Sequence, residues 1–176
     1  IGVALKFAAE MRDRHGLRLQ EFSPGGGFPI QYTVDKPPPP LAAYAEAIAQ
    51  AVSEACARWG LPLPLLLLEP GRAIVGRAGV ALYTVGAIKE IPQVRTYVSV
   101  DGGMGDNIRP AIYGARYEAL LAVRVQASSH EKVTIAGKYC ESGDVLVRDI
   151  ELPPVAPGDI IAVPASGAYC IPMSSN

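Results

Sequence analysis

The sequence is poor in the residues that build metal sites and disulfide frameworks. It has two histidines, His15 and His130, far apart in the chain, and three cysteines with no C-x-x-C pair. A histidine-based metal site is therefore not expected, and an odd, scattered set of cysteines argues against a disulfide framework or a structural zinc site. This cysteine usage favours a reducing compartment, and we predict a cytoplasmic protein without a metal.

Charge imbalance and long apolar runs are also missing. The 16 basic and 17 acidic residues leave a net charge of -1, so nucleic acid and anionic membranes are not expected partners. The wholly apolar run at 65–68 is far shorter than the roughly 20 residues of a membrane span. The hydrophobic share of 49% suits a globular core, and 176 residues suit one domain, or one and part of another.

The first part of the chain has an α/β pattern. Residues 3–15 and 41–59 carry apolar side chains at helical spacing, which predicts two helices. Strands are predicted at 17–22 and at 65–68, and the second is apolar throughout, as in a strand covered on both faces. Alternation of helices and strands predicts parallel strands. The chain enters its first helical pattern at Ile1 without a capping residue, and we interpret it as a fragment truncated at both ends.

The character of the sequence changes after about residue 80. Short strand-like segments follow one another with Pro- and Gly-containing turns between them. This spacing predicts an antiparallel sheet or barrel. We place the boundary near residue 90, with an α/β part at 1–90 and an all-β part at 91–176. The predicted strands of this region are 80–88, 96–101, 119–125, 145–150 and 159–163.

Two motifs follow the predicted strands of the first part. Gly25, Gly26 and Gly27 give a loop whose N–H groups a phosphate could reach, although three glycines also suit a flexible turn. The segment 69–72 (Glu-Pro-Gly-Arg) directly follows a strand, where parallel α/β folds place active sites. A surface turn with an ion pair is the alternative for that segment.

The segment Cys140-Glu141-Ser142-Gly143-Asp144 puts a thiol beside a carboxylate. A cysteine in such a place can donate a proton, act as a nucleophile or fill a core. The neighbouring glutamate can hold a cationic group of a substrate. Asp144 suits a structural role in a turn, and Cys56 and Cys170 are interpreted as packing residues.

Four segments together carry a family resemblance. They are 25–27, 69–72, 101–113 (Asp-Gly-Gly-Met-Gly-Asp-Asn-Ile-Arg-Pro-Ala-Ile-Tyr) and 140–144, with Gly-Ala-Tyr at 167–169 near the end. In order and spacing they resemble the diaminopimelate decarboxylase family of alanine-racemase-like, pyridoxal-phosphate-dependent decarboxylases. The resemblance implies the C-terminal part of a (β/α)8 barrel at 1–90, followed by an antiparallel β-domain at 91–176. It also implies a homodimer with active sites at the subunit interface, converting meso-2,6-diaminopimelate to L-lysine and CO2 in lysine biosynthesis.

The resemblance assigns a cofactor-binding set for pyridoxal 5'-phosphate. Glu69 matches the carboxylate that keeps the pyridinium nitrogen protonated, and Arg72 with the glycine loop matches the phosphate site. The lysine that anchors the cofactor and a histidine that stacks on its ring would precede Ile1. The full set of cofactor-binding residues is Gly25, Gly26, Gly27, Glu69, Pro70, Gly71, Arg72 and Tyr169.

The resemblance also assigns residues to the substrate. Arg109 and Tyr113 match positions that hold the distal carboxylate, to which Arg72 also contributes, and Glu141 matches the position that pairs with the distal ammonium. Tyr169 matches a residue near both cofactor and substrate. Cys140 matches the residue that returns a proton to Cα, entering from the partner subunit.

Two other functions stay open on the sequence. One is decarboxylation of a related diamino acid or polyamine precursor, and the other is a non-catalytic homologue or fragment that shares the fold. Substrate profiling distinguishes decarboxylation of a related diamino acid or polyamine precursor from decarboxylation of meso-2,6-diaminopimelate. The sequence upstream of Ile1 distinguishes a non-catalytic homologue or fragment from an enzyme.

Overall fold

The computed structural model describes residues 1–126 and 130–175, and the chain forms two compact units. One unit comprises residues 1–29 and 38–72, and the other comprises residues 30–37 and those from Ala73 onward. The units therefore divide after Arg72 and not near residue 90. The reason is that strand β3 (Ala81–Ile91) pairs with sheet strands on both sides.

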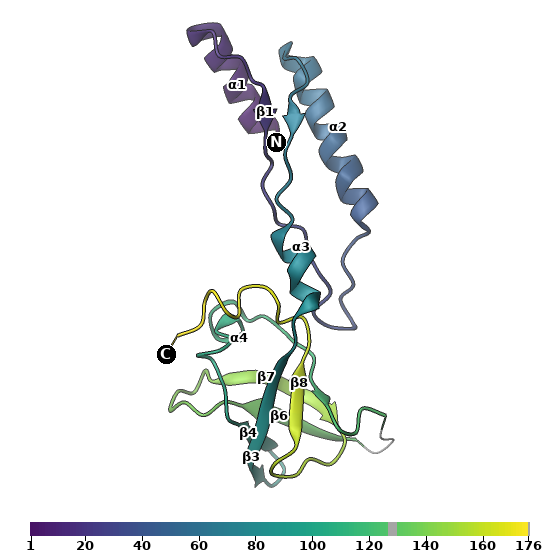
Figure 1. Ribbon diagram of the computed structural model, residues 1–176, viewed down its shortest axis with the longest axis vertical. Coiled ribbons are helices and arrows are strands. Elements are labelled where there is room, and N and C mark those ends of the chain that lie inside the picture. The colour runs from purple at the N-terminus through teal and green to yellow at the C-terminus, as the bar shows by residue number, and fades with distance from the viewer. Residues whose placement is uncertain (127–129, 176) are drawn as a thin grey trace. The chain divides into compact units, whose positions relative to one another are not determined.

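The first unit contains two helices and two short parallel strands. Helices α1 (Gly2–His15) and α2 (Leu41–Trp59) confirm both predicted helices, and strands β1 (Glu21–Phe22) and β2 (Leu65–Leu66) are shorter than predicted. Figure 1 shows α1 and α2 beside the strand pair. Each helix ends at a glycine in the left-handed conformation, a backbone state that glycine adopts without steric cost. The core residues are Leu5, Ala8, Ala9, Val52, Ala55, Cys56 and Leu61.

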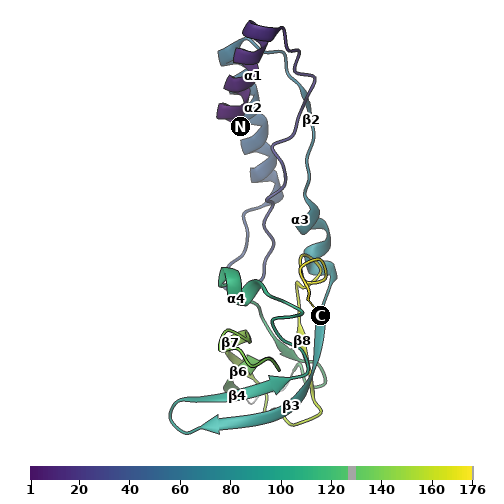
Figure 2. The ribbon, with the colours of Figure 1, turned by 90° about the vertical axis from the view of Figure 1, so that its left-hand side faces the viewer.

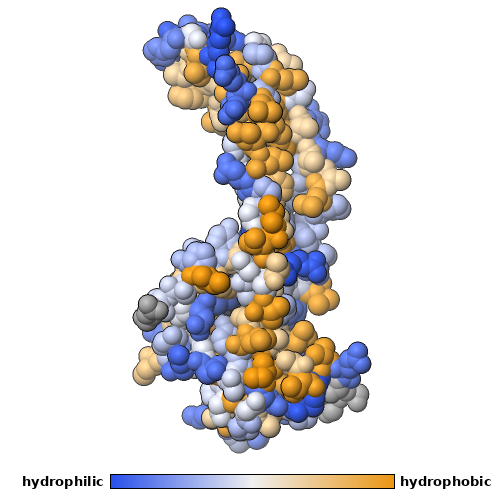
Figure 3. Space-filling model, in the orientation of Figure 1, coloured by the Kyte–Doolittle hydropathy of each residue, from blue (hydrophilic) through white to orange (hydrophobic). Residues whose placement is uncertain are grey.

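Much of the apolar surface of this unit is uncovered. Val3 and Phe7, two apolar residues of α1 at helical spacing, are 87% and 59% exposed, while Leu5 is buried. Leu65 and Leu67 are also exposed, so this strand is not covered on both faces by the described residues. Figure 3 shows hydrophobic residues gathered on the visible face of the unit.

The second unit contains a six-stranded sheet in the order β5-β8-β3-β4-β6-β7. Two short helices precede the sheet in the chain. They are α3 (Gly71–Val75), which begins within the first unit, and the 3-10 helix η1 (Gly76–Ala78). Figure 2 shows β3 and β4 as a long hairpin. The other strands are β4 (Arg95–Val100), β5 (Leu120–Leu121), β6 (Glu131–Ala136), β7 (Val145–Leu152) and β8 (Ile160–Val163).

The sheet is mixed, so the prediction of an antiparallel domain was wrong in one place. Strand β6 pairs parallel to β4, with Val98 opposite Ile135. A parallel pair needs a long crossover connection, and the segment 101–130 supplies one, carrying helix α4 (Arg109–Tyr113) and β5. The sequence analysis also missed β6 itself and the short helices α3 and α4.

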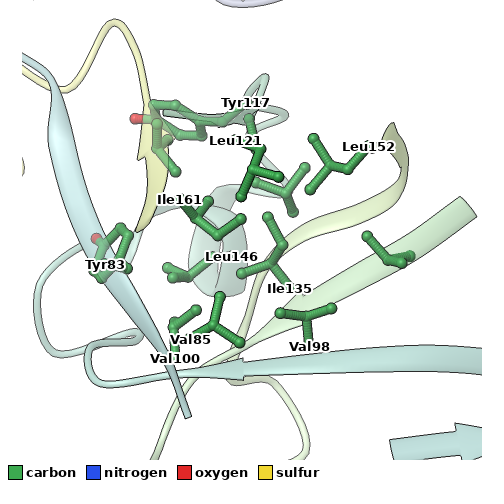
Figure 4. Packing of buried hydrophobic residues seen from close by; sticks show 14 residues of the cluster. Tyr83, Val85, Val98, Val100, Tyr117, Leu121, Ile135, Leu146, Leu152 and Ile161 are labelled. Atoms are coloured by element: carbon green, nitrogen blue, oxygen red, sulfur yellow. The ribbon is translucent and has the colours of Figure 1, made fainter. Parts of the chain in front are cut away.

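A single apolar cluster forms the core of the second unit (Figure 4). Alternate residues of β3, β4, β6 and β8 belong to it, as the two-residue period of a strand requires. Val98 and Val100 of β4 face Val85 of β3 and Leu146 of β7 (Figure 4). Because the strands are used to form this core, the candidate site residues of this unit lie on the segments that follow the strand ends. No helix in the described part of the chain is long and apolar enough to cross a membrane.

Candidate functional site

In the first unit, the parallel strand pair brings the two predicted cofactor motifs together. Glu21 lies opposite Leu65 and Phe22 opposite Leu66, so both strands end at the same edge. The loop after β1 therefore meets the segment after β2. The Ser23 hydroxyl donates a hydrogen bond to Glu69 Oε1 at 2.7 Å, and the Glu69 N–H donates to the Gly25 carbonyl at 3.3 Å.

The glycine loop requires glycine at each of its three positions. Gly25 and Gly27 have φ of 85° and 83°, values that side chains strongly disfavour. A Cβ at Gly26 would overlap the Glu69 carbonyl oxygen. Within the described residues, the N–H groups of Gly26 and Gly27 donate to no protein acceptor. Both glycines are exposed, so these donors are available to a ligand.

Arg72 lies against the same loop. Its Nε donates to the Phe28 carbonyl at 3.1 Å, and Nη2 donates to the Gly27 carbonyl at 3.4 Å. These contacts hold a positive charge beside unpaired backbone donors, which is the combination that a phosphate group needs. Pro70 and Gly71 form the turn that joins Glu69 to Arg72 at the start of α3. The residues present therefore fit a phosphate-bearing cofactor.

In the second unit, the Cys140-Glu141 segment lies on a tight loop between β6 and β7. Both side chains are exposed, so Cys140 is not a core residue. Glu141 Oε1 accepts hydrogen bonds from the Gly143 N–H at 3.1 Å and the Ser142 hydroxyl at 3.2 Å. A thiol that is exposed beside a fixed carboxylate can reach a ligand, whereas a packed thiol cannot.

Asp144 holds this loop, confirming its predicted structural role. Its side chain is 3% exposed and accepts from the N–H groups of Met104 (2.6 Å) and Tyr139 (2.8 Å). The carboxylate thus joins the Cys140 loop to the glycine-rich loop after β4. Gly103 and Gly137 pack so closely on Asp144 that neither position has room for a Cβ.

Arg109, at the start of α4, is enclosed by three tyrosine rings. Its guanidinium carbon lies 4.9, 5.8 and 5.4 Å from the ring centroids of Tyr32, Tyr117 and Tyr169. Its Nη1 donates to the Tyr117 hydroxyl at 2.5 Å. A cation over aromatic faces is attracted by the ring quadrupoles. We call Tyr32, Tyr117 and Tyr169 the tyrosine cage.

Beside Arg109 and Tyr32 lies a pocket of about 340 Å³. Arg109 and Tyr113, the predicted carboxylate-binding pair, both line it, together with Tyr32, Lys36 and Arg116. Tyr113 is 66% exposed. Arg116 forms an ion pair with Asp35 at 3.1 Å. The lining therefore concentrates positive charge, which suits an anionic group such as a carboxylate.

Burial and the hydrogen bond set the protonation states within the cage. Burial is the main cause that raises the pKa of Tyr117, and it outweighs the opposite effect of Arg109. Burial acts to lower the pKa of Arg109, but its hydrogen bond to Tyr117 and the nearby phenols raise it overall. Tyr117 therefore stays a neutral phenol and Arg109 a cation at neutral pH.

Tyr169 reaches the cage from a strained turn. Its φ is 70°, a left-handed conformation that few non-glycine residues adopt. The Gly167 N–H donates a hydrogen bond to the Gly76 carbonyl at 3.0 Å, which fixes the preceding turn. Gly79 and Gly167 also pack so closely that a Cβ at either position would overlap the other residue. The next residue, Cys170, is buried, as predicted for a packing residue, and burial raises the pKa of its thiol.

The predicted site residues thus fall into two groups, one in each unit. The glycine loop, Glu69 and Arg72 meet in the first unit, and Arg109, Tyr113 and Tyr169 meet in the second. The Cys140 loop approaches α4, since a Cβ at Gly143 would lie 3.9 Å from the Ala111 methyl group. Sequence reasoning missed Tyr32 and Tyr117, because nothing in the spacing of an isolated tyrosine marks it as a neighbour of Arg109.

Comparison with known proteins first defines the class. Residues 31–167 match the family described as "Pyridoxal-dependent decarboxylase, C-terminal sheet domain". The class is therefore that of pyridoxal-dependent decarboxylases, and the mixed sheet is their C-terminal sheet domain. The match covers most of the sequence, and the chain belongs to this family.

The curated relatives narrow the comparison to one enzyme. The chain is 50% identical over 167 residues to diaminopimelate decarboxylase of Bacillus subtilis (strain 168), which covers 95% of this chain and 38% of that protein. It is 49% identical over 162 residues to diaminopimelate decarboxylase of Synechocystis, covering 92% of this chain and 34% of that protein. The chain thus spans less than two fifths of the length of these two relatives.

Solved structures give the same result. Diaminopimelate decarboxylase from M. jannaschii in complex with L-lysine matches with a TM-score of 0.85 and 38% identity, covering 98% of this chain and 38% of that one. The Helicobacter pylori enzyme complexed with L-lysine matches with a TM-score of 0.81 and 30% identity, covering 99% and 40%.

Proposed function

We propose that this chain supplies part of a pyridoxal-phosphate-dependent decarboxylase that converts meso-2,6-diaminopimelate to L-lysine and CO2. The observation that carries the proposal is the exposed Cys140-Glu141 pair, on a loop that Asp144 holds beside α4. Identity of 50% to a diaminopimelate decarboxylase over 95% of the chain supports the choice of reaction.

The first unit would hold the cofactor. The free N–H groups of Gly26 and Gly27 and the charge of Arg72 would bind its phosphate, and Glu69 would keep its ring nitrogen protonated. When bound, the cofactor withdraws the electron pair left on the carbon that loses CO2. Pro70 and Gly71 set the spacing between Glu69 and Arg72. We also propose Tyr169 as a cofactor-binding residue.

Cys140 would return the proton. When the bond from Cα to the carboxylate breaks, its electron pair stays on Cα, and the thiol S–H gives its proton there to form the new C–H bond. A protonated thiol at hydrogen-bonding distance can act as a general acid. The exposure of Cys140 supports this role, because a proton donor must reach the substrate.

The remaining residues would bind the distal carboxylate and the distal ammonium of the substrate. An arginine fork is the natural partner of a carboxylate, and Arg109 shares its pocket with Tyr113. Glu141 would pair with the distal ammonium through the oxygen that is not engaged by Gly143 and Ser142. We also propose Arg72 as a substrate-binding residue.

The longer assembly is also part of the proposal. Residues 1–72 would complete a (β/α)8 barrel with chain that precedes them in the full-length protein, which would cover the exposed apolar side chains of α1 and β2. The enzyme would be a cytoplasmic homodimer in which Cys140 and Glu141 serve the partner subunit's site.

The test is an assay of the full-length protein that carries this sequence. With pyridoxal phosphate, it is expected to release one CO2 and one L-lysine for each meso-diaminopimelate consumed. Release of CO2 without L-lysine, or no turnover at all, would count against the proposed function.

A further inference from the structure

We propose that Tyr117 is the positioning residue that aims Arg109 at the carboxylate of the ligand, a role that rests on the proposed function for its choice of ligand. Tyr117 lies on the segment between α4 and β5, eight residues after Arg109, and its side chain is 3% exposed. It therefore acts on the ligand only through Arg109.

The hydrogen bond fixes one end of the guanidinium. Arg109 Nη1 donates to the Tyr117 hydroxyl at 2.5 Å, a short distance typical of a charge-assisted bond. Because one nitrogen is committed to a buried acceptor, rotation of the planar group about its long axis is restricted. The orientation of the other nitrogens is then set by the core rather than by a flexible side chain.

The other nitrogens are left for a ligand. Among residues 1–126 and 130–175, neither Nε nor Nη2 of Arg109 donates to a protein acceptor. The guanidinium lines the pocket that Tyr113 and Lys36 share. An arginine whose donors are pre-oriented loses less side-chain entropy on binding a carboxylate than one that must be ordered by it.

The core anchors Tyr117 itself. Tyr117 belongs to the apolar cluster of the sheet, and Tyr32 packs edge-on against it with ring centroids 5.1 Å apart. Tyr32 in turn covers the guanidinium at 4.9 Å. The position of Arg109 is therefore determined by the sheet core through two tyrosines, and not by α4 alone, which is only five residues long.

Two ligands that differ by one carboxylate test the role. L-Lysine keeps the carboxylate of the carbon centre that is not decarboxylated, whereas cadaverine (1,5-diaminopentane) lacks it. In calorimetric titrations of the full-length protein loaded with pyridoxal phosphate, Tyr117→Phe is expected to weaken L-lysine binding about tenfold or more, since a hydrogen bond to a charged group is lost. Cadaverine binding is expected to change less than about twofold, because no carboxylate is involved.

Tyr83→Phe is the matched control. Tyr83 is buried in the same cluster, so this variant also removes one phenol oxygen from the core but leaves Arg109 untouched. Its affinity for both ligands is expected to equal that of the wild type. Equal weakening of both ligands by Tyr117→Phe, or no weakening of either, would overturn the positioning role.

The outcomes also separate this inference from the proposed function. A protein that shows the Tyr117 dependence but does not decarboxylate meso-diaminopimelate keeps the positioning role and loses the proposed function. A protein that decarboxylates meso-diaminopimelate but binds L-lysine equally well without the Tyr117 hydroxyl keeps the proposed function and loses the positioning role. Wild-type protein that binds L-lysine no more tightly than cadaverine would overturn the inference, because Arg109 would then not bind the carboxylate of the ligand.

Discussion

The carboxylate of Asp144 accepts a hydrogen bond from the backbone N–H of Met104, at 2.6 Å and across 40 residues of sequence. This contact joins the loop that carries Cys140 to the loop that leads into α4 and Arg109. The loop of Cys140 and the loop that leads to Arg109 are therefore tied to a common buried residue. The loops are fixed by a hydrogen bond rather than by their own sequence preferences.

Replacing Asp144 is expected to loosen both loops. Asp144→Ala leaves the partly buried N–H groups of Met104 and Tyr139 without their acceptor, which costs about 1–3 kcal/mol of unfolding free energy. Denaturant unfolding of the full-length protein measures the loss. Asp13→Ala is the control, since Asp13 pairs only with its neighbour Arg12 at the surface and should change stability by less than about 0.5 kcal/mol. Equal stability of the two variants would contradict the role of Asp144.

Gly26→Ala is expected to weaken binding of pyridoxal phosphate. The new methyl group would overlap the Glu69 carbonyl, so the loop and its N–H donors must shift. We expect at least a tenfold loss of cofactor affinity, the effect of about one lost charge-assisted hydrogen bond, measured by the absorbance of the bound cofactor. Gly2→Ala has open space around it and serves as the control. Unchanged affinity in Gly26→Ala would argue against a phosphate site at this loop.

Cys140→Ala is expected to slow turnover by about 10²–10⁴, the usual contribution of a general acid, while cofactor binding stays unchanged. Steady-state kinetics and a cofactor titration measure the two effects separately. Cys56→Ala removes a thiol that is buried between α1 and α2 and should leave kcat as it is. Full activity in Cys140→Ala would remove the proton-donor role.

The hydroxyl of Tyr32 is the one buried side-chain oxygen or nitrogen of the described residues that has no hydrogen-bond partner. Leaving such a group unpaired costs free energy, so removing it is favourable when the ring stays in place. Tyr32→Phe is therefore expected to raise the unfolding free energy by about 1 kcal/mol. A thermal melt that moves downward in this variant would show that the hydroxyl has a partner in solution.

Asp101 links stability to acidic pH. The hydrogen bond from the Thr84 N–H, at 2.8 Å, is the main cause that lowers its pKa in the folded protein. A lowered folded-state pKa gives stability that is present above the usual carboxyl range and is lost as the pH falls through it. Asp101→Asn should therefore show a shallower loss of stability than the wild type as the pH falls below about 4, the ordinary pKa of an aspartate. Parallel pH profiles would contradict this link.

The sequence predicted the two long helices better than the sheet. Helix α2 has the predicted bounds because its apolar spacing and terminal Gly60 are local signals. Strand β6 was missed because its first two residues, Glu131 and Lys132, break the apolar pattern. Its parallel pairing with β4 depends on a crossover of thirty residues, which no local pattern encodes.

The same distinction applies to the site. Glu69 and Arg72 could be proposed from the sequence because they follow a predicted strand within a short motif. The roles of Tyr117 and Tyr32 come from contacts across chain segments, and single tyrosines with no common spacing give no signal of such contacts. The division after Arg72, rather than near residue 90, likewise follows from the pairing of β3 and not from its composition.

Substrate preference tests the central claim most directly. The measurement is kcat/KM of the full-length protein with pyridoxal phosphate, for meso-diaminopimelate and for L-ornithine, which lacks a distal carboxylate. A site built around Arg109 is predicted to favour meso-diaminopimelate by at least about 10²-fold, because a site that binds a particular substrate group rejects a substrate that lacks it. Equal or better use of L-ornithine would contradict the proposed function and the role of Arg109 together.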